Sequence, residues 1–548
     1  MSYVIRGGTV YDGTGAPGVR ADVKVEGGRI AAIGEGLAGD IEIDAGGEAV
    51  APGFIDIHTH YDAQVFWDPL LTPSSWHGVT SVVAGNCGFS IAPVRRADRE
   101  TMIDTLRLVE DMNPDTLAAG VTWDAFETYP EYLDAVAARG VRLNYGGYVG
   151  HTAVRIYVMG DEAFERRARS DEIAAMQDII RAAIKAGAIG FSSSMAGTHI
   201  GAGGRPVPSR VADVEEFMAL VEPLRDAGRG VISVVAGGPL GRPQIFALQR
   251  HADRPLTWTP LLTLPGFDHD AARRENDVAR AAGGDVWGQT ACRPIVFQET
   301  LASPFTLMRT PAFAELASAT PEERAAAYRD PAWRARAGEQ MVATRPPHWP
   351  GVTVSETARR PDLVGRSMSE LAAERRCTPL EAMLDVALED GLATRFNLPV
   401  ANADPAEVGP LLQAEGVLIG LADSGAHVGQ LCDACFATDL LGTWVREREV
   451  LTLAEAVRKL TSEPAAFLGL EGRGTLRPGM AADICVFDPE TVAPGKLRRI
   501  RDFPAEGERL VADAPSGVRH VLVNGRPIRL HGEEVDVEAR PGQMLGRA

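Results

Sequence analysis

Two histidines one residue apart, His58 and His60, offer the clearest chemistry in this sequence. They end the segment GFIDIHTH, whose earlier residues are largely apolar and indicate a buried strand. Since side chains alternate along a strand, both imidazoles would point toward the barrel interior described below and could share one cation. A lone histidine is more often a core residue, but a His-x-His pair after Pro-Gly-Phe-Ile-Asp favours a metal site.

Cys87 is the second kind of metal ligand that the sequence offers. It follows an apolar run within the tight sequence Gly-Asn-Cys-Gly. Glycine on either side permits unusual backbone angles and the close approach of a ligand, and a thiolate is a soft ligand that suits zinc. The alternative is a small buried hydrophobe, since free cysteine is commonly buried. We predict that Cys87 binds Zn²⁺ together with His58 and His60, as one ion or, alternatively, two.

Asp423 is the predicted general base. It lies in the segment GLADSGAH, at the end of the last apolar run of the central region, which we expect to be next to the first run in a closed ring. A carboxylate there can contact the metal, accept a proton from the attacking water and deliver it to the leaving nitrogen. The alternative is that Asp423 caps the helix that follows. We predict both metal binding and catalysis for Asp423.

Four further polar residues follow predicted strand ends and are candidate substrate contacts: His151, Arg155, Arg293 and His427. Arg155 is close enough to His151 to bind a substrate carboxylate as a bidentate fork. His427 follows Asp423 by four residues, and a plain loop histidine is an equal alternative. Arg293 and His199, after strands seven and four, are weaker candidates, and for each of them a structural or solvent-facing place is the favoured alternative.

The elements that must position these residues alternate between buried strands and amphipathic helices, the rhythm of parallel βαβ units. We count eight candidate strands, GFIDIHTH, VTSVVAGNCG, VRLNYGGYVGH, GAIGFSSS, GVISVVAGG, LTWTPLLTL, DVWGQTACRP and GVLIGLADSGAH. Eight such units predict an α/β fold, a (β/α)8 TIM barrel over residues 53–470, in which polar residues at the carboxyl ends of the strands do the chemistry.

Both ends of the chain have a different pattern. Residues 1–52 alternate short β-type runs with Gly-bearing turns, and the same pattern returns in residues 471–548, where Asn-Gly marks a hairpin. We predict that these two segments build one small β-sandwich domain, with the barrel inserted between its halves.

An insertion of about residues 300–404 separates strands seven and eight. It is rich in Ala, Arg, Glu and Pro and is predicted to be mostly helical. It could cover the barrel mouth as a lid, and a packing or oligomer contact is an equal alternative.

The composition limits the classes of partner. A net charge of -19, spread along the chain, argues against nucleic acid, because binding to a duplex depends on neutralising phosphates. The sequence has no apolar stretch long enough to span a membrane and does not begin like a signal peptide, so we expect no membrane and a cytoplasmic location. Six irregularly spaced cysteines fit reduced thiols there. We expect a small-molecule substrate and a homo-oligomer.

Six stretches of the chain resemble the N-acyl-D-amino-acid deacylases (D-aminoacylases) of the amidohydrolase superfamily: APGFIDIHTHYDAQ, HGVTSVVAGNCGFSIAP, WDAFETYPEYLDAV, VGHTAVRIYVMG, KAGAIGFSSS and EGRGTLRPGMAADICVFDPETV. They cover the N-terminal third and the C-terminal end, and GNCG after HTH is the most specific. The resemblance implies a barrel with a β-sandwich, zinc bound with help from Cys87, Asp423 as acid and base, and hydrolysis of an N-acyl amide next to a free carboxylate.

The sequence departs from this family in the second half of the barrel. The family has metal-binding histidines at the ends of strands five and six, where this chain reads GVISVVAGG and LTWTPLLTL. None of its four lysines ends a barrel strand, so the carbamylated lysine that bridges two metals in many amidohydrolases has no counterpart. If two metals bind, Cys87 is the natural bridge. The resemblance carries over to His58, His60, Cys87 and Asp423 alone.

Three functions fit these observations. The first is a metal-dependent hydrolase that cleaves the amide C–N bond of an N-acyl amino acid or similar N-acyl compound by a zinc-activated water, with Asp423 as general acid and base. The second keeps the fold and cleaves a cyclic amide, imide or carbamate, because one metal site serves several such bonds. The third is a catalytically lapsed protein that only binds a small molecule.

Overall fold

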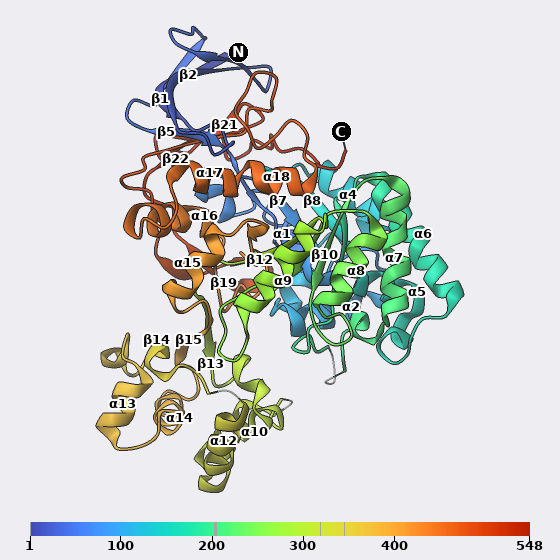
Figure 1. Cartoon of the computed structure of the whole chain (residues 1–548). Helices are drawn as coiled ribbons and strands as arrows, with labels where there is room; N and C mark the ends of the chain where they lie inside the picture. Colours follow the sequence, from blue (N-terminus) through green and yellow to red (C-terminus); the bar gives the residue numbers. More distant parts are fainter. Residues whose placement is uncertain (1, 202–204, 318, 345, 548) are drawn as a thin grey trace.

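A parallel barrel forms the centre of the molecule in the computed structural model, which describes residues 2–201, 205–317, 319–344 and 346–547 (Figure 1). Its strands are β6 (Phe54–Asp56), β7 (Val79–Ala84), β8 (Asn144–Gly150), β9 (Gly190–Ser194), β10 (Val231–Val235), β11 (Leu256–Thr259), β12 (Val286–Thr290) and β16 (Val417–Ile419). They pair in parallel in the order β16-β12-β11-β10-β9-β8-β7-β6. Beyond the ends of β6 and β16, Thr59 bridges Ser424 in parallel and brings the two edges together. The predicted (β/α)8 barrel and its eight strands are confirmed.

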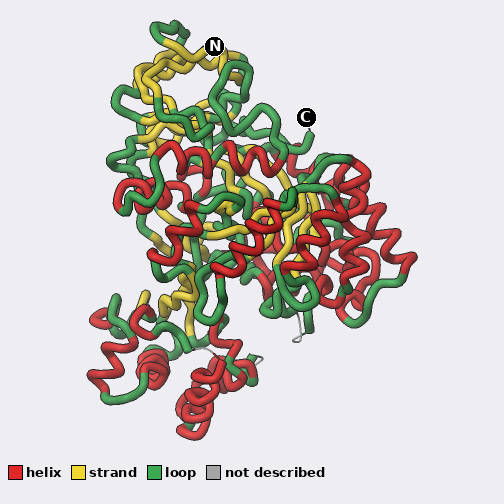
Figure 2. Tube along the Cα trace, in the orientation of Figure 1, coloured by secondary structure: helices red, strands yellow, loops and turns green. Residues whose placement is uncertain are grey.

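Amphipathic helices cover the outside of this barrel (Figure 2). In α6, the buried residues Met176, Ile180, Ala183 and Ile184 recur every three or four positions and form one apolar face. The longer barrel helices are α4 (Tyr129–Arg139), α6 (Ser170–Ala186), α7 (Val214–Ala227), α8 (Arg242–Ala252), α9 (His269–Ala281), α15 (Pro405–Gln413) and α17 (Leu453–Leu460). Helices in the connections include α1 (Tyr61–Gln64), α2 (Arg99–Val109), α3 (Pro114–Gly120), α5 (His151–Met159), α16 (Phe436–Asp439) and α18 (Ser462–Leu468).

The two chain ends meet, as the sequence predicts, and their strands form a nine-stranded sheet that fits the expected β-sandwich domain. Its strands are β1 (Ser2–Val10), β2 (Val19–Glu26), β3 (Arg29–Gly34), β4 (Ile41–Asp44), β5 (Ala49–Pro52), β17 (Ile484–Phe487), β20 (Val518–Val523), β21 (Arg526–Leu530) and β22 (Glu533–Glu534). The halves join where β5 pairs with β17. Asn524 and Gly525, both with positive φ, turn the chain between β20 and β21, as a tight hairpin requires.

Part of the C-terminal segment leaves this sheet and returns to the barrel. The hairpin of β18 (Leu497–Phe503) and β19 (Gly507–Ala512) is separate from the nine-stranded sheet. The backbone N–H of Leu510 donates to the Val428 carbonyl at 2.6 Å, and the Arg509 guanidinium donates to the Thr72 carbonyl at 2.8 Å. The hairpin therefore packs against the loop that follows Asp423.

The insertion forms a lobe at the end of the barrel opposite the chain termini (Figure 1). It contains helices α10 (Pro311–Ala314), α11 (Pro321–Arg329), α12 (Pro331–Thr344), α13 (Met368–Arg375) and α14 (Pro379–Glu389). It also contains an antiparallel sheet of β13 (Ile295–Thr300), β14 (Thr353–Glu356) and β15 (Arg395–Ala401), which composition alone did not reveal. These strands are half-buried, so their apolar signal is weak. The role of the lobe as a lid stays a prediction.

The described part of the chain contains no helix long and apolar enough to cross a membrane. Its six cysteines are all free thiols. Cys87 differs from most of the others because it is only half-buried.

Candidate metal centre

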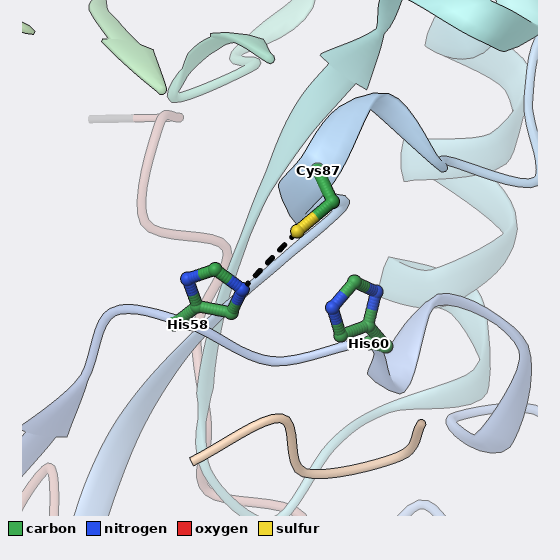
Figure 3. A group of neighbouring side chains, drawn as sticks. All are labelled: His58, His60 and Cys87. Carbon is green, nitrogen blue, oxygen red and sulfur yellow. Dashed lines mark hydrogen bonds between the residues drawn. The ribbon is translucent and has the colours of Figure 1, made fainter. Parts of the chain in front are cut away.

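Three predicted ligands meet at the mouth of the barrel. One ligand atom from each of His58, His60 and Cys87 lies within 4.8 Å of the others. Figure 3 shows the Cys87 sulfur directed toward His58, where Sγ lies 3.4 Å from Nε2. The two imidazoles come from the segment after β6, and Cys87 comes from the short turn Asn86–Gly88 after β7. Adjacent strands of the barrel thus supply one compact donor set.

Asp423 completes this set from the other side of the barrel closure. Its Oδ1 lies 3.1 Å from Nε2 of His58 and 3.7 Å from Nε2 of His60. The histidine side chains are almost fully buried, whereas 28% of the Asp423 side chain is exposed. All four residues that the sequence nominates as metal ligands are brought together, and solvent reaches Asp423 as well as the half-buried Cys87.

The backbone around these residues is specialised for close approach. Cys87 and Asp423 both have positive φ, 56° and 45°, which costs energy for residues other than glycine and is found at functional sites. Gly85 and Gly425 have positive φ as well, and a Cβ on them would lie 2.5 Å from the Tyr148 carbonyl and 2.6 Å from the His60 carbonyl. Only glycine fits at these two points, which hold the two ligand loops against the barrel.

The electrostatics of the donor set favour a cation. Burial lowers the pKa of His58, but the charges of Cys87 and Asp423 outweigh it and raise that pKa to about 10. Burial also opposes ionisation of Asp423, yet hydrogen bonds with His58 and His60 hold its pKa well below its usual range. The site therefore stabilises positive charge between its acidic members, and Asp423 is ionised at neutral pH.

The chemistry of these four donors matches zinc. Zinc in proteins takes imidazole nitrogen, thiolate sulfur and carboxylate oxygen, usually four ligands in total with one position left to water in catalytic sites. His58, His60, Cys87 and Asp423 offer these three donor types within one cluster. The residues present fit one zinc ion without the histidines of strands five and six.

Gln289 orients His58 and was not predicted from the sequence. Its Oε1 lies 2.8 Å from Nδ1 of His58, and both side chains are buried. Because an amide oxygen accepts hydrogen bonds, Nδ1 carries the proton and Nε2 is left facing Cys87 and Asp423. Gln289 is the second-last residue of β12, and both it and Thr290 are polar. Inspection of the polar residues at every strand end would therefore have found it.

We expect Gln289→Leu to lower zinc affinity roughly 10–100-fold, the usual effect of removing a partner of a metal-binding histidine. Gln289→Glu keeps an acceptor at the same atom and is expected to retain most of the affinity. Competition with a chromogenic chelator measures both. Equal zinc affinity in wild type and Gln289→Leu would show that the hydrogen bond does not control His58.

Glu110 is a second residue that sequence reasoning missed. It follows α2 and is 3% exposed, with Oε1 3.6 Å from Nδ1 of His60 and Oε2 3.8 Å from Nε2 of His427. The backbone N–H of His427 donates to the Glu110 carbonyl at 2.6 Å. Glu110 therefore links a predicted ligand, His60, to a predicted substrate contact, His427. It belongs to no motif, so the sequence gives no signal for this role.

His427 lies at the edge of the centre rather than in it. Its ring packs against Phe297 and Phe305, with centroids 5.4 Å from each, and both phenylalanines belong to the insertion side of the mouth. The structure thus keeps His427 near the ligands, although a contact with substrate stays a prediction.

His151 and Arg155 lie in a separate, fully buried network. His151 Nε2 is 2.9 Å from Oε1 of Glu216, and the Arg155 guanidinium donates to both Glu216 carboxylate oxygens at 2.6 and 2.5 Å. Nδ1 of His151 lies 2.8 Å from the Ser193 hydroxyl. The fork that we assigned to a substrate carboxylate is already filled by Glu216 of α7, so the structure does not bring these residues to the centre.

Arg293 is also paired within the protein. Its Nε donates to Asp433 at 2.7 Å and its Nη1 to Asp439 at 2.9 Å. These contacts tie the end of β12 to the segment after the Asp423 loop. They give Arg293 a structural place, and a role in binding substrate stays an untested prediction.

A cavity of about 330 Å³ lies beside the centre. Its walls include Gly425 from the Asp423 loop, Asp111 from the segment after α2, Arg395 from the insertion, and Phe503 and Glu508 from the β18–β19 hairpin. None of the four candidate ligands lines it. The insertion and the C-terminal hairpin therefore both reach the mouth of the barrel next to the ligand loops.

Comparison with known proteins agrees with this fold. Residues 42–529 match the model of the family described as the amidohydrolase family. A D-aminoacylase of Alcaligenes xylosoxydans xylosoxydans is 31% identical over 99% of this chain and 97% of its own length.

Two solved structures extend the likeness to three dimensions. A D-aminoacylase studied for the role of its binuclear metal centre has a TM-score of 0.69 at 26% identity and covers 100% of this chain and 99% of its own. The N-acyl-D-glutamate deacylase of Bordetella bronchiseptica, complexed with zinc and a phosphonate that mimics the tetrahedral intermediate, has a TM-score of 0.67 at 28% identity and covers 99% of each chain.

Proposed function

Because the chain belongs to the amidohydrolase family, we propose that it hydrolyses the amide bond of an N-acyl amino acid or a similar small N-acyl compound, with zinc as its cofactor. The observation that carries this proposal is the cluster of His58, His60, Cys87 and Asp423 at the carboxyl ends of the barrel strands. In such barrels, this face holds the active site.

His58, His60, Cys87 and Asp423 are the residues that would hold the ion. When bound, zinc polarises the amide carbonyl and activates a water molecule as the nucleophile. Asp423 accepts the proton of that water, because it is the ionised and accessible member of the cluster. It then delivers the proton to the leaving nitrogen as the C–N bond breaks. Gln289 and Glu110 keep the two imidazoles in place throughout.

The substrate panel that tests this function contains N-acetyl amino acids of both configurations and cyclic amides such as hydantoins. We expect the zinc-loaded protein to release free amine from N-acetyl amino acids, with a preference for one configuration, and His58→Ala to release none. If the protein binds zinc but hydrolyses cyclic amides only, it is a cyclic-amide hydrolase and not an N-acyl amino acid hydrolase. Absence of both zinc binding and turnover would leave only a binding role.

A further inference from the structure

His199 packs beside the Cys87 loop, yet the proposed mechanism does not use it. It follows β9 by five residues, and its ring packs edge-on against Phe89 with centroids 5.1 Å apart. Phe89 is two residues from Cys87. The strand itself is tied to the Cys87 loop, because the Gly88 N–H donates to the Ser192 hydroxyl at 3.1 Å and that hydroxyl donates to the Gly85 carbonyl. The position of His199 relative to Cys87 is therefore fixed by neighbouring barrel strands.

Ser194 sets the orientation and the tautomer of this ring. Its hydroxyl oxygen lies 2.7 Å from Nδ1 of His199 and accepts a hydrogen bond from the Ala196 N–H at 3.1 Å. Among the described residues, Nδ1 of His199 is the acceptor in reach of the Ser194 O–H, so the hydroxyl donates to Nδ1. The ring proton then resides on Nε2. Ser194 is fully buried and can hold this arrangement.

The remaining nitrogen is directed away from the Ser194 bond and stays a neutral donor. No described residue forms a hydrogen bond with Nε2 of His199, and the residue is partly exposed. Burial, followed by the positive charges of His427 and His60, lowers the pKa of His199 to about 3. These two histidines and Asp423 are the charged groups that act on it from the centre, and Arg210 acts from its own side. His199 thus presents an uncharged N–H within electrostatic reach of the predicted ligands.

We propose that Nε2–H of His199 donates a hydrogen bond to the carbonyl oxygen of the substrate and stabilises the negative charge that develops there. This inference rests on the proposed amide hydrolysis. As the water oxygen bonds to the carbonyl carbon, the π electron pair moves to the carbonyl oxygen, which accepts the His199 hydrogen bond. When that pair returns, the C–N bond breaks and the nitrogen leaves with the proton carried by Asp423. A preorganised neutral donor strengthens as the charge grows and does not lose its own proton.

The barrel offers few alternatives for this task. β10 and β11 end at Val235 and Thr259 and are followed by Ala236 and Pro260, none of which has a side chain that donates to an oxyanion through nitrogen. His151 is engaged by Glu216 and Ser193. Of His151 and His199, the histidines that follow β8 and β9, His199 is therefore the one whose second nitrogen is left for a ligand.

A binding experiment tests this role without relying on turnover. The zinc-loaded protein is titrated calorimetrically with a phosphonate analogue of an N-acetyl amino acid, whose tetrahedral oxygens stand for the oxyanion. We expect His199→Leu to bind it roughly 100-fold more weakly, the scale of one lost oxyanion donor, with unchanged zinc content. His199→Gln retains an N–H donor and is expected to recover much of the affinity, and Ser194→Ala to weaken binding less than His199→Leu. His269→Leu on the barrel surface is the matched control.

Equal phosphonate affinity in wild type and His199→Leu overturns the inference, as does a wild type that binds the phosphonate no better than the carboxylate product. If His199→Leu does not fold, the phosphonate affinity of Ser194→Ala is the test, because without the hydroxyl the ring proton of His199 is no longer held on Nε2. Equal affinity in wild type and Ser194→Ala then overturns the inference. A wild type that releases no amine from any N-acyl compound, while His199→Leu still weakens phosphonate binding, rejects the proposed function but supports His199 as the donor to a tetrahedral oxygen at this site.

Discussion

Asp423→Asn is expected to retain zinc and to lose turnover roughly 10²–10⁴-fold, the range for removal of a general acid and base. Asparagine has nearly the same shape and keeps an oxygen toward His58 and His60, so the packing of the centre survives. It cannot accept the proton of the attacking water or return one to the leaving nitrogen. The value of kcat for amine release, measured at matched zinc occupancy, isolates this chemical effect from metal loss.

The control for this substitution is Asp404→Asn. Asp404 is exposed and its side chain caps α15 by accepting from the Ala406 N–H, so its replacement changes the charge without removing a member of the donor set. We expect it to leave kcat unchanged. If Asp423→Asn kept the turnover of wild type, Asp423 would be only a ligand or a structural residue. If it lost zinc and turnover in proportion, its role would be confined to binding the ion.

The barrel could be predicted because its strands are almost wholly buried and several of them have a continuous apolar run. β10, with the sequence VISVV, is the clearest case, since every residue is buried. The insertion could not be predicted so well. β13 and β15 alternate between buried and partly exposed residues and pair with partners about 100 residues apart, so their signal was lost within an Ala- and Arg-rich region that favours helix.

In the candidate centre, too, the residues at the ends of barrel strands could be predicted and those in long connections could not. His58, His60, Cys87 and Asp423 directly follow barrel strands, so the strand ends alone predicted their meeting. Glu110 reaches His60 from the end of a helix in a long connection, and no periodicity locates such a residue. The end of a strand also fixes where a residue lies, but not the direction in which its side chain points.

His151 is a residue whose position could be predicted but whose side-chain direction could not. It begins α5 directly after β8, where a catalytic residue is expected, yet its side chain turns outward to Glu216 of α7. The counterion, which lies 65 residues away in the sequence, decided the outcome. Burial of Arg155 beside it requires such a carboxylate, because a buried charge must be paired.

Cys87→Ala should weaken zinc binding roughly 10²–10³-fold. The free energy of zinc binding to four-ligand sites is about 10–16 kcal/mol, so one ligand contributes roughly 2.5–4 kcal/mol, and each 1.4 kcal/mol corresponds to about tenfold. Cys87 is half-buried with its sulfur 3.4 Å from His58, so alanine removes the donor without opening a deep cavity in the core. Chelator competition measures the loss, and the unfolding midpoint of the metal-free protein shows whether the fold is intact.

Cys377→Ala separates loss of a ligand from loss of any thiol. Cys377 is likewise half-buried but packs against the core of the insertion, so its removal should leave zinc affinity unchanged. Equal affinities for wild type, Cys87→Ala and Cys377→Ala would mean that the thiol of Cys87 only packs, and that His58, His60 and Asp423 suffice. A loss confined to Cys87→Ala would instead make the thiol a full ligand. That result would explain how this chain can hold zinc although strands five and six bring no histidine, because His58, His60, Cys87 and Asp423 would form a complete site from the first two strands and the last.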